Sequence, residues 1–373
     1  MSTFSRTDTS LFGRWWWTID RWSLVALATL VACGLVLAMA ATPPVAERIG
    51  LDPFHFTRRQ FLFLPLAFGT VLAVSMLGSR GVRRLALAML TASMVMLVLT
   101  LVIGSEVKGA QRWLSIGGLS IQASEFAKPA FAVLAAWMFA EWRNSGDLPG
   151  HWVATGLYLI IAMLLLMQPD VGQTIVLSAI WAVQFFLAGL PLMIVAVLGL
   201  LFLGGAVAAY FTFSHVQLRI DRFLDPEAEG YQIARATEAF LKGGLFGRGP
   251  GEGRVKEVLP DAHADFVFAV VGEEFGLIVC LLLVALFAFM VLRGFARVLA
   301  DDDLFKLLAV AGLLTQFGLQ ALINMASTLS LMPPKGMTLP FLSYGGSSVM
   351  ALAIGMGMVF ALTRKGTGRG GTS

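Results

Sequence analysis

Apolar runs of about 20 residues recur along this chain, and they constrain its fold more than any other feature. A run of that length can cross the hydrocarbon core of a bilayer as an α-helix. Hydrophobic residues make up 57% and charged residues 13% of the sequence, whereas soluble domains carry about 25% charged residues. The alternating pattern of a transmembrane β-barrel does not occur. We therefore predict an all-α polytopic integral membrane protein with ten transmembrane helices. The predicted spans are residues 23–42, 60–78, 85–104, 126–142, 153–168, 171–188, 191–213, 264–292, 304–329 and 343–363.

The long polar segment 214–263 separates the seventh predicted span from the eighth. With this segment set aside, Lys and Arg favour the side that holds both termini, and long loops cross membranes largely regardless of charge. The sequence therefore predicts a cytoplasmic tail at 1–22, a ten-helix membrane domain at 23–363 and a second cytoplasmic tail at 364–373. Residues 214–263 become the large extracytoplasmic loop. We expect contacts with membrane lipids and, because no basic stripe is present, none with nucleic acid.

The loop contains six glycines in the stretch "LKGGLFGRGPGEGRVK", between Gly243 and Gly253. A nucleotide-binding loop is excluded, because no Gly-Lys-Ser/Thr ends the stretch and no βαβ unit surrounds it. Two interpretations stay open. The glycines form a tight, irregular backbone against protein or lipid headgroups, or they form a flexible linker.

Charged residues also occur inside otherwise apolar segments. In "GAQRWLSIGGLSIQASEFAKPAF", Glu125 and Lys128 are three residues apart and share one face of a helix. They form a local ion pair, or Lys128 points inward toward an anionic ligand, since ionisable residues in membrane helices are functional candidates. Arg112, before Trp113, suits a headgroup anchor if considered alone.

Two further segments interrupt the apolar pattern. In "MQPDVGQT", Asp170 and Gln173 have the spacing of a helix-capping box, which favours a structural role. Short or broken helices also mark binding sites in membrane proteins, so a functional role stays open. The stretch "NMASTLSLMPPKGMTLPFLSYGGSS" contains Lys335 among prolines and glycines. Such irregular backbone at membrane depth must be buried in protein or line a cavity.

The stretch "VLPDAHADFVFAVVGEEFG" combines five ionisable residues with an apolar run. We expect Asp261 and His263 to be polar loop residues. A regular helix would place Glu273 about 12 Å deeper than Asp265. Because Glu273 and Glu274 point about 100° apart on a helix, one cavity should hardly hold both. At least one should pair with a buried cation or cap loop amides.

The segments "GAQRW", "QASEFAK", "QPDVG", "LPDAHADFVFAVVGEEFG" and "PPKGMTLPFLSYGGSS" occur in this order. They resemble the signatures of the SEDS family, the bacterial shape, elongation, division and sporulation proteins, over roughly residues 60–363. Ala123 departs from the family pattern, which usually has proline there. The Lys335–Thr338 part of the last motif resembles the cell-division member more than the elongation member.

The resemblance implies a peptidoglycan glycosyltransferase that polymerises lipid II, with ten spans and both termini in the cytoplasm. It also implies a place in the bacterial cytoplasmic (inner) membrane at the division septum. Implied partners are a class B penicillin-binding protein transpeptidase and other division proteins of the septum. Three alternatives stay open: an elongation polymerase of the same family, a lipid II flippase or transporter, and a non-catalytic division scaffold.

The resemblance also assigns candidate site residues. It places the essential acid at Asp265, where a base would take a proton from the acceptor sugar, and it requires cations that stabilise the departing pyrophosphate. The substrate-binding candidates are Arg112, Lys128, Lys335, Ser343 and Gly345. Structural or undecided roles fall to Glu125, Asp170, His263, Glu273 and Glu274. No cofactor or metal follows from ligand spacing, and a divalent cation, Mg or Mn, stays open.

Overall fold

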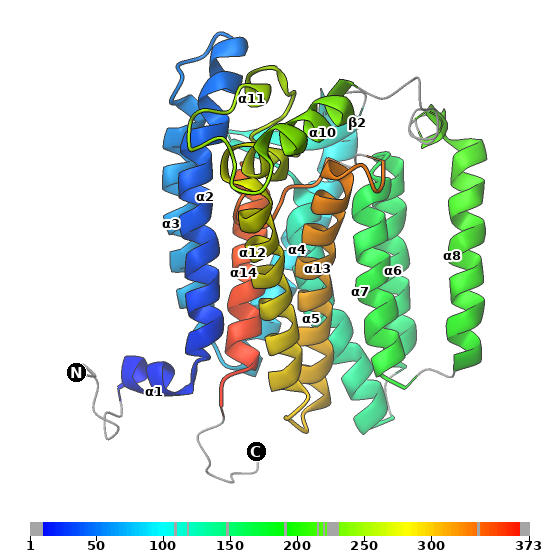
Figure 1. Cartoon of the computed structure of the whole chain (residues 1–373). Helices are drawn as coiled ribbons and strands as arrows, with labels where there is room; N and C mark the ends of the chain where they lie inside the picture. The colour runs from blue at the N-terminus through cyan, green and yellow to red at the C-terminus, as the bar shows by residue number, and fades with distance from the viewer. Residues whose placement is uncertain are drawn as a thin grey trace.

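The computed structural model of the protein is a bundle of long helices, with short elements at one end (Figure 1). The structure describes residues 10–107, 110–117, 119–146, 149–189, 192–214, 216–218, 221, 231–333 and 336–365. Within these ranges, five helices are long and apolar enough to cross a membrane, namely α2, α4, α6, α12 and α13. The protein is therefore a largely helical, multi-pass membrane protein.

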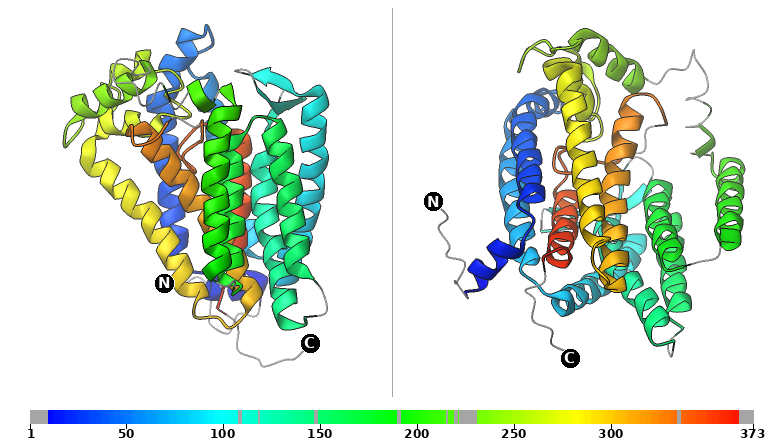
Figure 2. Two further views of the ribbon diagram at one scale, coloured as in Figure 1. Left: turned by 90° about the vertical axis from the view of Figure 1, so that its right-hand side faces the viewer. Right: turned by 60° about the horizontal axis from the view of Figure 1, so that its bottom comes forward.

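The described elements follow in chain order. They are α1 (Leu11–Thr18), α2 (Arg21–Arg48), α3 (His55–Ser75), α4 (Ser79–Ile103), β1 (Ser105–Val107), β2 (Ala110–Ile116), β3 (Leu119–Ile121), α5 (Ala123–Asn144), α6 (Gly150–Met167), α7 (Val171–Leu187), α8 (Leu192–Thr212), α10 (Tyr231–Gly243), α11 (Val255–Val258), α12 (Val267–Val298), α13 (Leu304–Thr328) and α14 (Gly346–Leu362). Figures 1 and 2 agree that α10, α11 and the strands lie at one end of the bundle, opposite α1. Every predicted span overlaps a helix, in order from α2 to α8 and from α12 to α14.

A small antiparallel sheet departs from the all-α prediction. Its strands pair in the order β1-β2-β3. Ile116 lies opposite Leu119 beside the β2–β3 turn, and Gly117 in that turn has a φ of 58°, which glycine adopts without steric cost. The segment 105–121 is too polar to cross a bilayer, and the backbone groups of its three strands pair with one another instead.

The core is centred on α5 and α13. Most residues of α13 are buried, so α13 is central. In α12, residues 267–274 before the break at Gly276 are buried and many of those after it are exposed, so only the second part of α12 lies at the edge. The side of α5 that faces its neighbours is rich in alanine. Small residues let membrane helices approach closely, and α5 packs against α4, α6 and α13.

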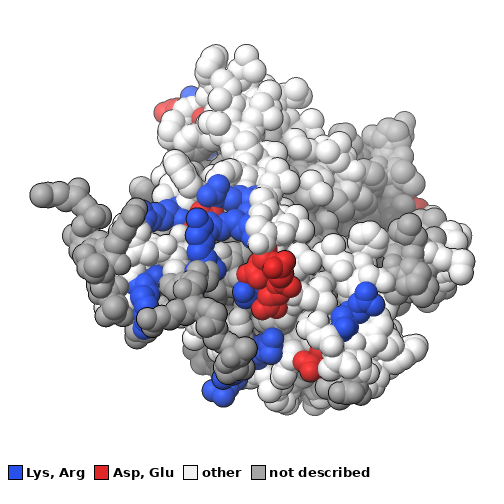
Figure 3. Space-filling view, turned by 90° about the horizontal axis from the view of Figure 1, so that it is seen from below, with Lys and Arg blue, Asp and Glu red and all other residues white. Residues whose placement is uncertain are grey.

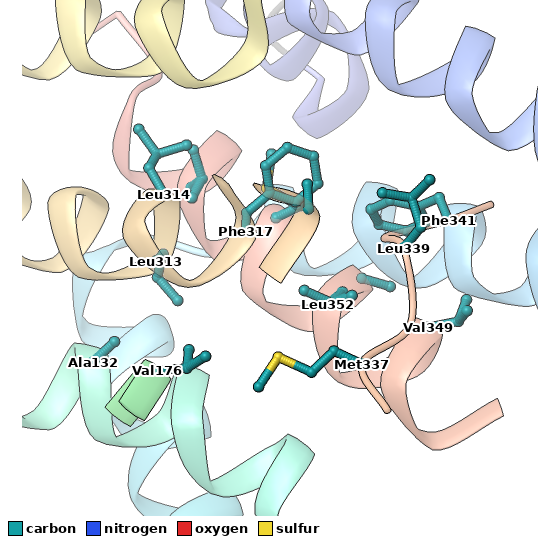
Figure 4. Packing of buried hydrophobic residues seen from close by; sticks show 14 of the residues in the cluster. Ala132, Val176, Leu313, Leu314, Phe317, Met337, Leu339, Phe341, Val349 and Leu352 are labelled. Carbon is teal, nitrogen blue, oxygen red and sulfur yellow. The ribbon is translucent and has the colours of Figure 1, made fainter. Parts of the chain in front are cut away.

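The connection between α13 and α14 is part of this core. Met337, Leu339 and Phe341 are buried, and Figure 4 shows them packed among side chains of α13 and α14. A Cβ added to Gly34 of α2 would lie 2.1 Å from the carbonyl oxygen of Phe341, so α2 also approaches this connection closely. Within the irregular segment, Met337 and residues 339–343 are therefore buried in protein, as the sequence predicts, whereas Leu331 and Gly336 are exposed.

The glycine-rich stretch packs against a break in α12 and forms backbone hydrogen bonds with it. At Gly276 the backbone has φ 79° and ψ 179°, a region essentially restricted to glycine. The freed carbonyls of Glu273 and Glu274 accept hydrogen bonds from the amides of Arg248 (2.9 Å) and Gly249 (3.0 Å). Past the break, the amides of Leu277 and Ile278 donate to the carbonyls of Gly244 (2.9 Å) and Leu245 (3.3 Å). The tight-backbone interpretation is confirmed, and the flexible linker is not what this stretch forms.

Gly247 provides a test of this close backbone contact. Its φ is 80°, and a Cβ there would lie 2.2 Å from the carbonyl oxygen of Glu274, which is backbone and cannot move aside cheaply. Gly247→Ala should therefore lower the thermal unfolding midpoint in detergent and reduce activity. Gly251→Ala is the matched control, because Gly251 has a φ of 84° but open space around it. Equal effects of the two substitutions would contradict the close contact.

At the opposite end of the bundle, Lys and Arg side chains gather on the face shown in Figure 3. Asp20, just before α2, binds Arg293 of α12 through two hydrogen bonds of 2.6 and 2.8 Å. Arg297 adds an ion pair of 3.0 Å. Burial raises the pKa of Asp20, but hydrogen bonds from Arg293, Ser23 and Arg297 outweigh it and hold that pKa well below its ordinary value. This carboxylate therefore ties α2 to the end of α12.

Candidate active site

Asp265 lies in a series of turns that leads into α12. The carbonyl oxygen of Asp261 accepts hydrogen bonds from the amides of Ala264 (3.0 Å) and Asp265 (3.1 Å), which fixes the turn. The side chain of Asp265 is partly exposed. A Cβ added to Gly336 would lie 3.5 Å from its Oδ2 atom. The carboxylate therefore lies beside the connection between α13 and α14.

The ring of His263 belongs to an aromatic cluster. It stacks on Phe56 of α3, with 4.9 Å between ring centroids, and lies 5.4 Å from the ring of Tyr344. The carbonyl oxygen of His263 accepts a hydrogen bond of 2.8 Å from the Tyr344 amide. These contacts attach the turn that carries Asp265 to α3 and to the start of α14.

Lys128 of α5 is buried, with an exposed fraction of 1%. Its Nζ donates to Glu125 Oε2 at 3.0 Å and to Gln320 Oε1 at 3.4 Å, and also to Gln173 Oε1. Glu125 Oε1 accepts a bond of 2.6 Å from Gln173 Nε2. The ion pair that the spacing predicts is present, and it lies within a wider network that includes α7 and α13.

Two amide side chains of α13 connect this network to the surroundings of Asp265. Gln320 Nε2 donates to the carbonyl oxygen of Thr338 at 3.2 Å and to Ser348 Oγ at 3.1 Å. Asn324 lies four residues further along, on the same helix face. Its Nδ2 donates to the carbonyl oxygens of Asp265 at 2.9 Å and Met337 at 2.6 Å. The buried ion pair and Asp265 are thus attached to the same short segment, Met337–Thr338.

Sequence reasoning missed Gln320 and Asn324. The available signal was the set of amides at four-residue spacing in the apolar α13 segment, Gln316, Gln320 and Asn324. A buried amide is stable when its polar atoms are hydrogen-bonded, so this stripe indicated a polar surface opposite α13.

Arg112 of β2 holds the connection between α6 and α7. It donates to the carbonyl oxygens of Gln168 at 3.3 Å and Pro169, and it lies 3.8 Å from the Asp170 carboxylate. The Arg112 side chain is 24% exposed, so one edge stays accessible. Burial raises the pKa of the Asp170 carboxyl above its ordinary value, and the Arg112 guanidinium opposes that rise.

Asp170 caps α7, as the sequence pattern predicts. Its Oδ1 accepts a bond of 3.4 Å from the Gln173 amide, and its Oδ2 accepts one of 3.3 Å from Gln122 Nε2. The second half of a capping box is not formed by this pair. The Gln173 side chain contacts Glu125 and Lys128 instead, because a buried ion pair needs further hydrogen-bond partners.

The other substrate-binding candidates lie near the α13–α14 connection. Ser343 is buried, and its Oγ accepts a bond of 2.8 Å from the Leu339 amide. Its carbonyl oxygen accepts one of 3.1 Å from Gln60 Nε2. A Cβ at Gly345 would lie 3.0 Å from Thr338 Cγ2. Lys335 lies outside the described residues.

Glu273 and Glu274 both serve the loop that precedes Asp265. Glu273 Oε1 accepts bonds from the amides of Arg254 (2.8 Å) and Val255 (2.9 Å) at the start of α11. Glu274 pairs with buried Lys256 and accepts a bond of 3.1 Å from the Gly251 amide. The expectation that at least one would pair or cap is confirmed. The expectation that one site could hardly hold both is wrong, because the loop wraps around the α12 break and reaches both side chains.

The described residues contain no group of three or more His, Cys, Asp and Glu side chains that could hold a metal ion. Glu273 and Glu274 bind amides and Lys256. In the described part of the chain, the divalent cation left open by the sequence therefore has no preformed set of three such ligands.

Comparison with known proteins gives matches over nearly the whole chain. The model of the FtsW, RodA and SpoVE family, described as cell cycle protein, matches residues 21–367. The probable peptidoglycan glycosyltransferase FtsW of Caulobacter vibrioides is 46% identical over 372 residues, covering 99% of this chain and 95% of that protein. The protein of the same name from Escherichia coli O6:H1 is 34% identical over 359 residues, covering 92% of this chain and 85% of that protein.

Solved structures share the fold. One chain, from work on the structural coordination of polymerization and crosslinking by a peptidoglycan synthase complex, is 29% identical with a TM-score of 0.75, covering 92% of this chain and 97% of that one. The rod shape determining protein RodA of Thermus thermophilus is 29% identical with a TM-score of 0.67, covering 93% and 97%. Fold and site thus define a multi-pass helical membrane protein with the architecture of RodA. The chain belongs to the SEDS family, which confirms the resemblance that its five motifs carry.

Proposed function

We propose that this protein is a peptidoglycan glycosyltransferase that polymerises lipid II during cell division. The observation that carries the proposal is the identity of 46% over 99% of the chain with a probable peptidoglycan glycosyltransferase FtsW. The elongation alternative is less favoured, because the solved RodA structure is 29% identical to this chain. The flippase and scaffold alternatives do not account for an acid held beside the α13–α14 connection.

In the proposed reaction, Asp265 is the general base. The acceptor sugar hydroxyl loses its proton to the Asp265 carboxylate, and its oxygen attacks the anomeric carbon of the donor. The bond from that carbon to the pyrophosphate breaks, and the lipid-linked pyrophosphate leaves with the electron pair. This displacement inverts the anomeric centre. The proposal is supported by the half-buried position of Asp265 next to Gly336.

Cations must offset the charge that develops on the leaving pyrophosphate. We assign this role to Arg112, whose guanidinium is partly exposed, and to Lys128. Lys128 would have to turn from Glu125 to the substrate. Glu125 would keep partners in that state, because Gln173 Nε2 (2.6 Å) and Ser348 Oγ (3.4 Å) already donate to it. We also propose substrate-binding roles for Lys335, Ser343 and Gly345, because they belong to the motif that resembles the family signature.

The topology and partners form a second part of the proposal. Ten helices would cross the inner membrane, with residues 1–22 and 364–373 in the cytoplasm and 214–263 outside. The domain 23–363 would work at the septum with a class B penicillin-binding protein transpeptidase and other division proteins. This partnership is supported by the likeness to a chain of a peptidoglycan synthase complex that coordinates polymerization and crosslinking.

The test is polymerisation by the purified full-length chain in liposomes that contain lipid II. The assay is run with and without the transpeptidase, and glycan strands are separated by gel electrophoresis. We expect strands that a muramidase degrades. Movement of lipid II across the bilayer without strand formation would instead support a flippase, and neither activity in the complete complex would support a scaffold.

A further inference from the structure

Asn324 makes two contacts that join segments distant in the sequence. Its Nδ2 donates to the carbonyl oxygen of Asp265 at 2.9 Å and to that of Met337 at 2.6 Å. Its exposed fraction is 2%. One buried side chain on a central helix thus holds both the turn that carries the proposed base and the connection that faces it.

The hydrogen bonds of Asn324 are one-sided. Its Oδ1 has no hydrogen-bond partner among the described residues, so the side chain acts there as a donor of two protons. Burying an unpaired amide oxygen costs free energy. Asparagine at this position therefore gains two hydrogen bonds through its N–H groups and loses free energy through its buried Oδ1. An apolar side chain would avoid that cost but would lose both hydrogen bonds.

The geometry at Asp265 depends on the segment that Asn324 clamps. Oδ2 of Asp265 lies 3.5 Å from the place where a Cβ at Gly336 would be, and Met337 follows directly. Thr338, the next residue, is held by Gln320, which also contacts Lys128. Asn324 thus sets the position of Asp265 relative to a segment that the buried ion pair also restrains.

We propose that Asn324 is a positioning residue for Asp265, fixing the carboxylate by clamping its backbone to Met337. This inference rests on the proposed function, in which Asp265 is the general base. Misplacement of a catalytic group by about 1 Å costs up to about 100-fold in rate. Asn324 touches neither substrate nor reacting atoms, so its loss should act on kcat and not on KM.

Asn324→Leu tests the inference, because leucine has a similar size and no donor. In the complete complex, kcat for lipid II polymerisation should fall about 10- to 100-fold, while KM for lipid II stays near its original value. Asn324→Ser keeps one donor and should give an intermediate kcat; it also serves if the leucine variant fails to insert. Gln316→Leu is the matched control on α13, since Gln316 is also 2% exposed and its Nε2 has no hydrogen-bond partner in the described part. It should leave kcat unchanged.

The decisive measurement is a double-mutant cycle with Asp265→Asn. If Asn324 acts through Asp265, then Asn324→Leu should add little to the loss already caused by Asp265→Asn. If Asn324→Leu lowers the residual rate of Asp265→Asn by the same factor as it lowers the wild-type rate, the positioning role is overturned, while the large loss in Asp265→Asn leaves the base assignment standing. Normal turnover in Asp265→Asn would overturn the base assignment and the positioning role together. A rise in KM with unchanged kcat in Asn324→Leu would also refute the inference.

Discussion

Asp265→Asn should lower lipid II polymerisation by ~10²–10⁴-fold, the range that general base catalysis contributes. Asparagine keeps the size of the side chain and removes its basicity. The fold should survive, because Asn324 binds the backbone carbonyl of residue 265 at 2.9 Å and not its side chain. Lipid II binding should survive too, since the contacts to the leaving group lie elsewhere. Single-turnover polymerisation and a separate lipid II binding assay measure the two effects.

Asp261→Asn is the matched control for this experiment. Asp261 has a φ of 53°, and asparagine is among the residues that tolerate this region best. The carbonyl oxygen that organises the turn is unchanged by the substitution, so little activity should be lost. If Asp261→Asn were inactive while Asp265→Asn polymerised lipid II normally, the assignment of Asp265 as the general base would be wrong. Loss of lipid II binding in Asp265→Asn would indicate that Asp265 positions substrate or metal.

Acidification gives an independent check on the base. Wild-type turnover should fall once the carboxylate of Asp265 becomes protonated, because a protonated carboxyl cannot take the proton of the acceptor hydroxyl. The residual activity of Asp265→Asn should lack this step in its pH profile. If the turnover of Asp265→Asn falls on acidification in the same way as that of the wild type, the group that becomes protonated is a residue other than Asp265.

The helical architecture could be predicted from the sequence because each helix is a local property of the chain. An apolar run of about 20 residues needs no partner to indicate a span, and every predicted span overlaps a helix. In contrast, the sheet and the glycine-rich stretch depend on hydrogen bonds between separate segments of the chain, which no local pattern reveals. Gly247 lies against Glu274 only because α12 breaks at Gly276, and a lone glycine in an apolar run does not reveal that break.

The candidate site follows the same division. The local spacing of Glu125 and Lys128 predicted their ion pair, and the pairing and capping by Glu273 and Glu274 followed from the cost of buried charge. What the sequence could not provide was the shared attachment at Met337–Thr338. That attachment requires α13 to lie beside the α13–α14 connection, with Gln320 and Asn324 on the facing side.

Lys128→Met should destabilise the fold strongly. It would leave the Glu125 carboxylate, 4% exposed, without its cation in the bundle interior. Removing one partner of a buried ion pair typically costs about 3–5 kcal/mol. A lower thermal unfolding midpoint in detergent should therefore accompany any loss of activity, and the single variant cannot separate a structural role from a role toward substrate.

The double variant Lys128→Met/Glu125→Gln separates them. Removing both charges leaves no unpaired buried charge, and well-packed apolar residues of similar volume often replace a buried ion pair without loss of stability. Methionine is such a residue at position 128, and a glutamine at position 125 keeps oxygen and nitrogen atoms for Gln173 and Ser348. We expect the double variant to recover the unfolding midpoint and to remain unable to polymerise lipid II, because the ammonium that offsets the pyrophosphate charge is missing. Glu125→Gln alone is the control, and it should lose less activity than the double variant. Recovery of both stability and turnover in the double variant would show that Lys128 and Glu125 are a structural pair.

Lys128→Arg should restore little activity whether Lys128 acts on the substrate or only on the fold. A planar guanidinium does not replace a compact ammonium with three buried partners.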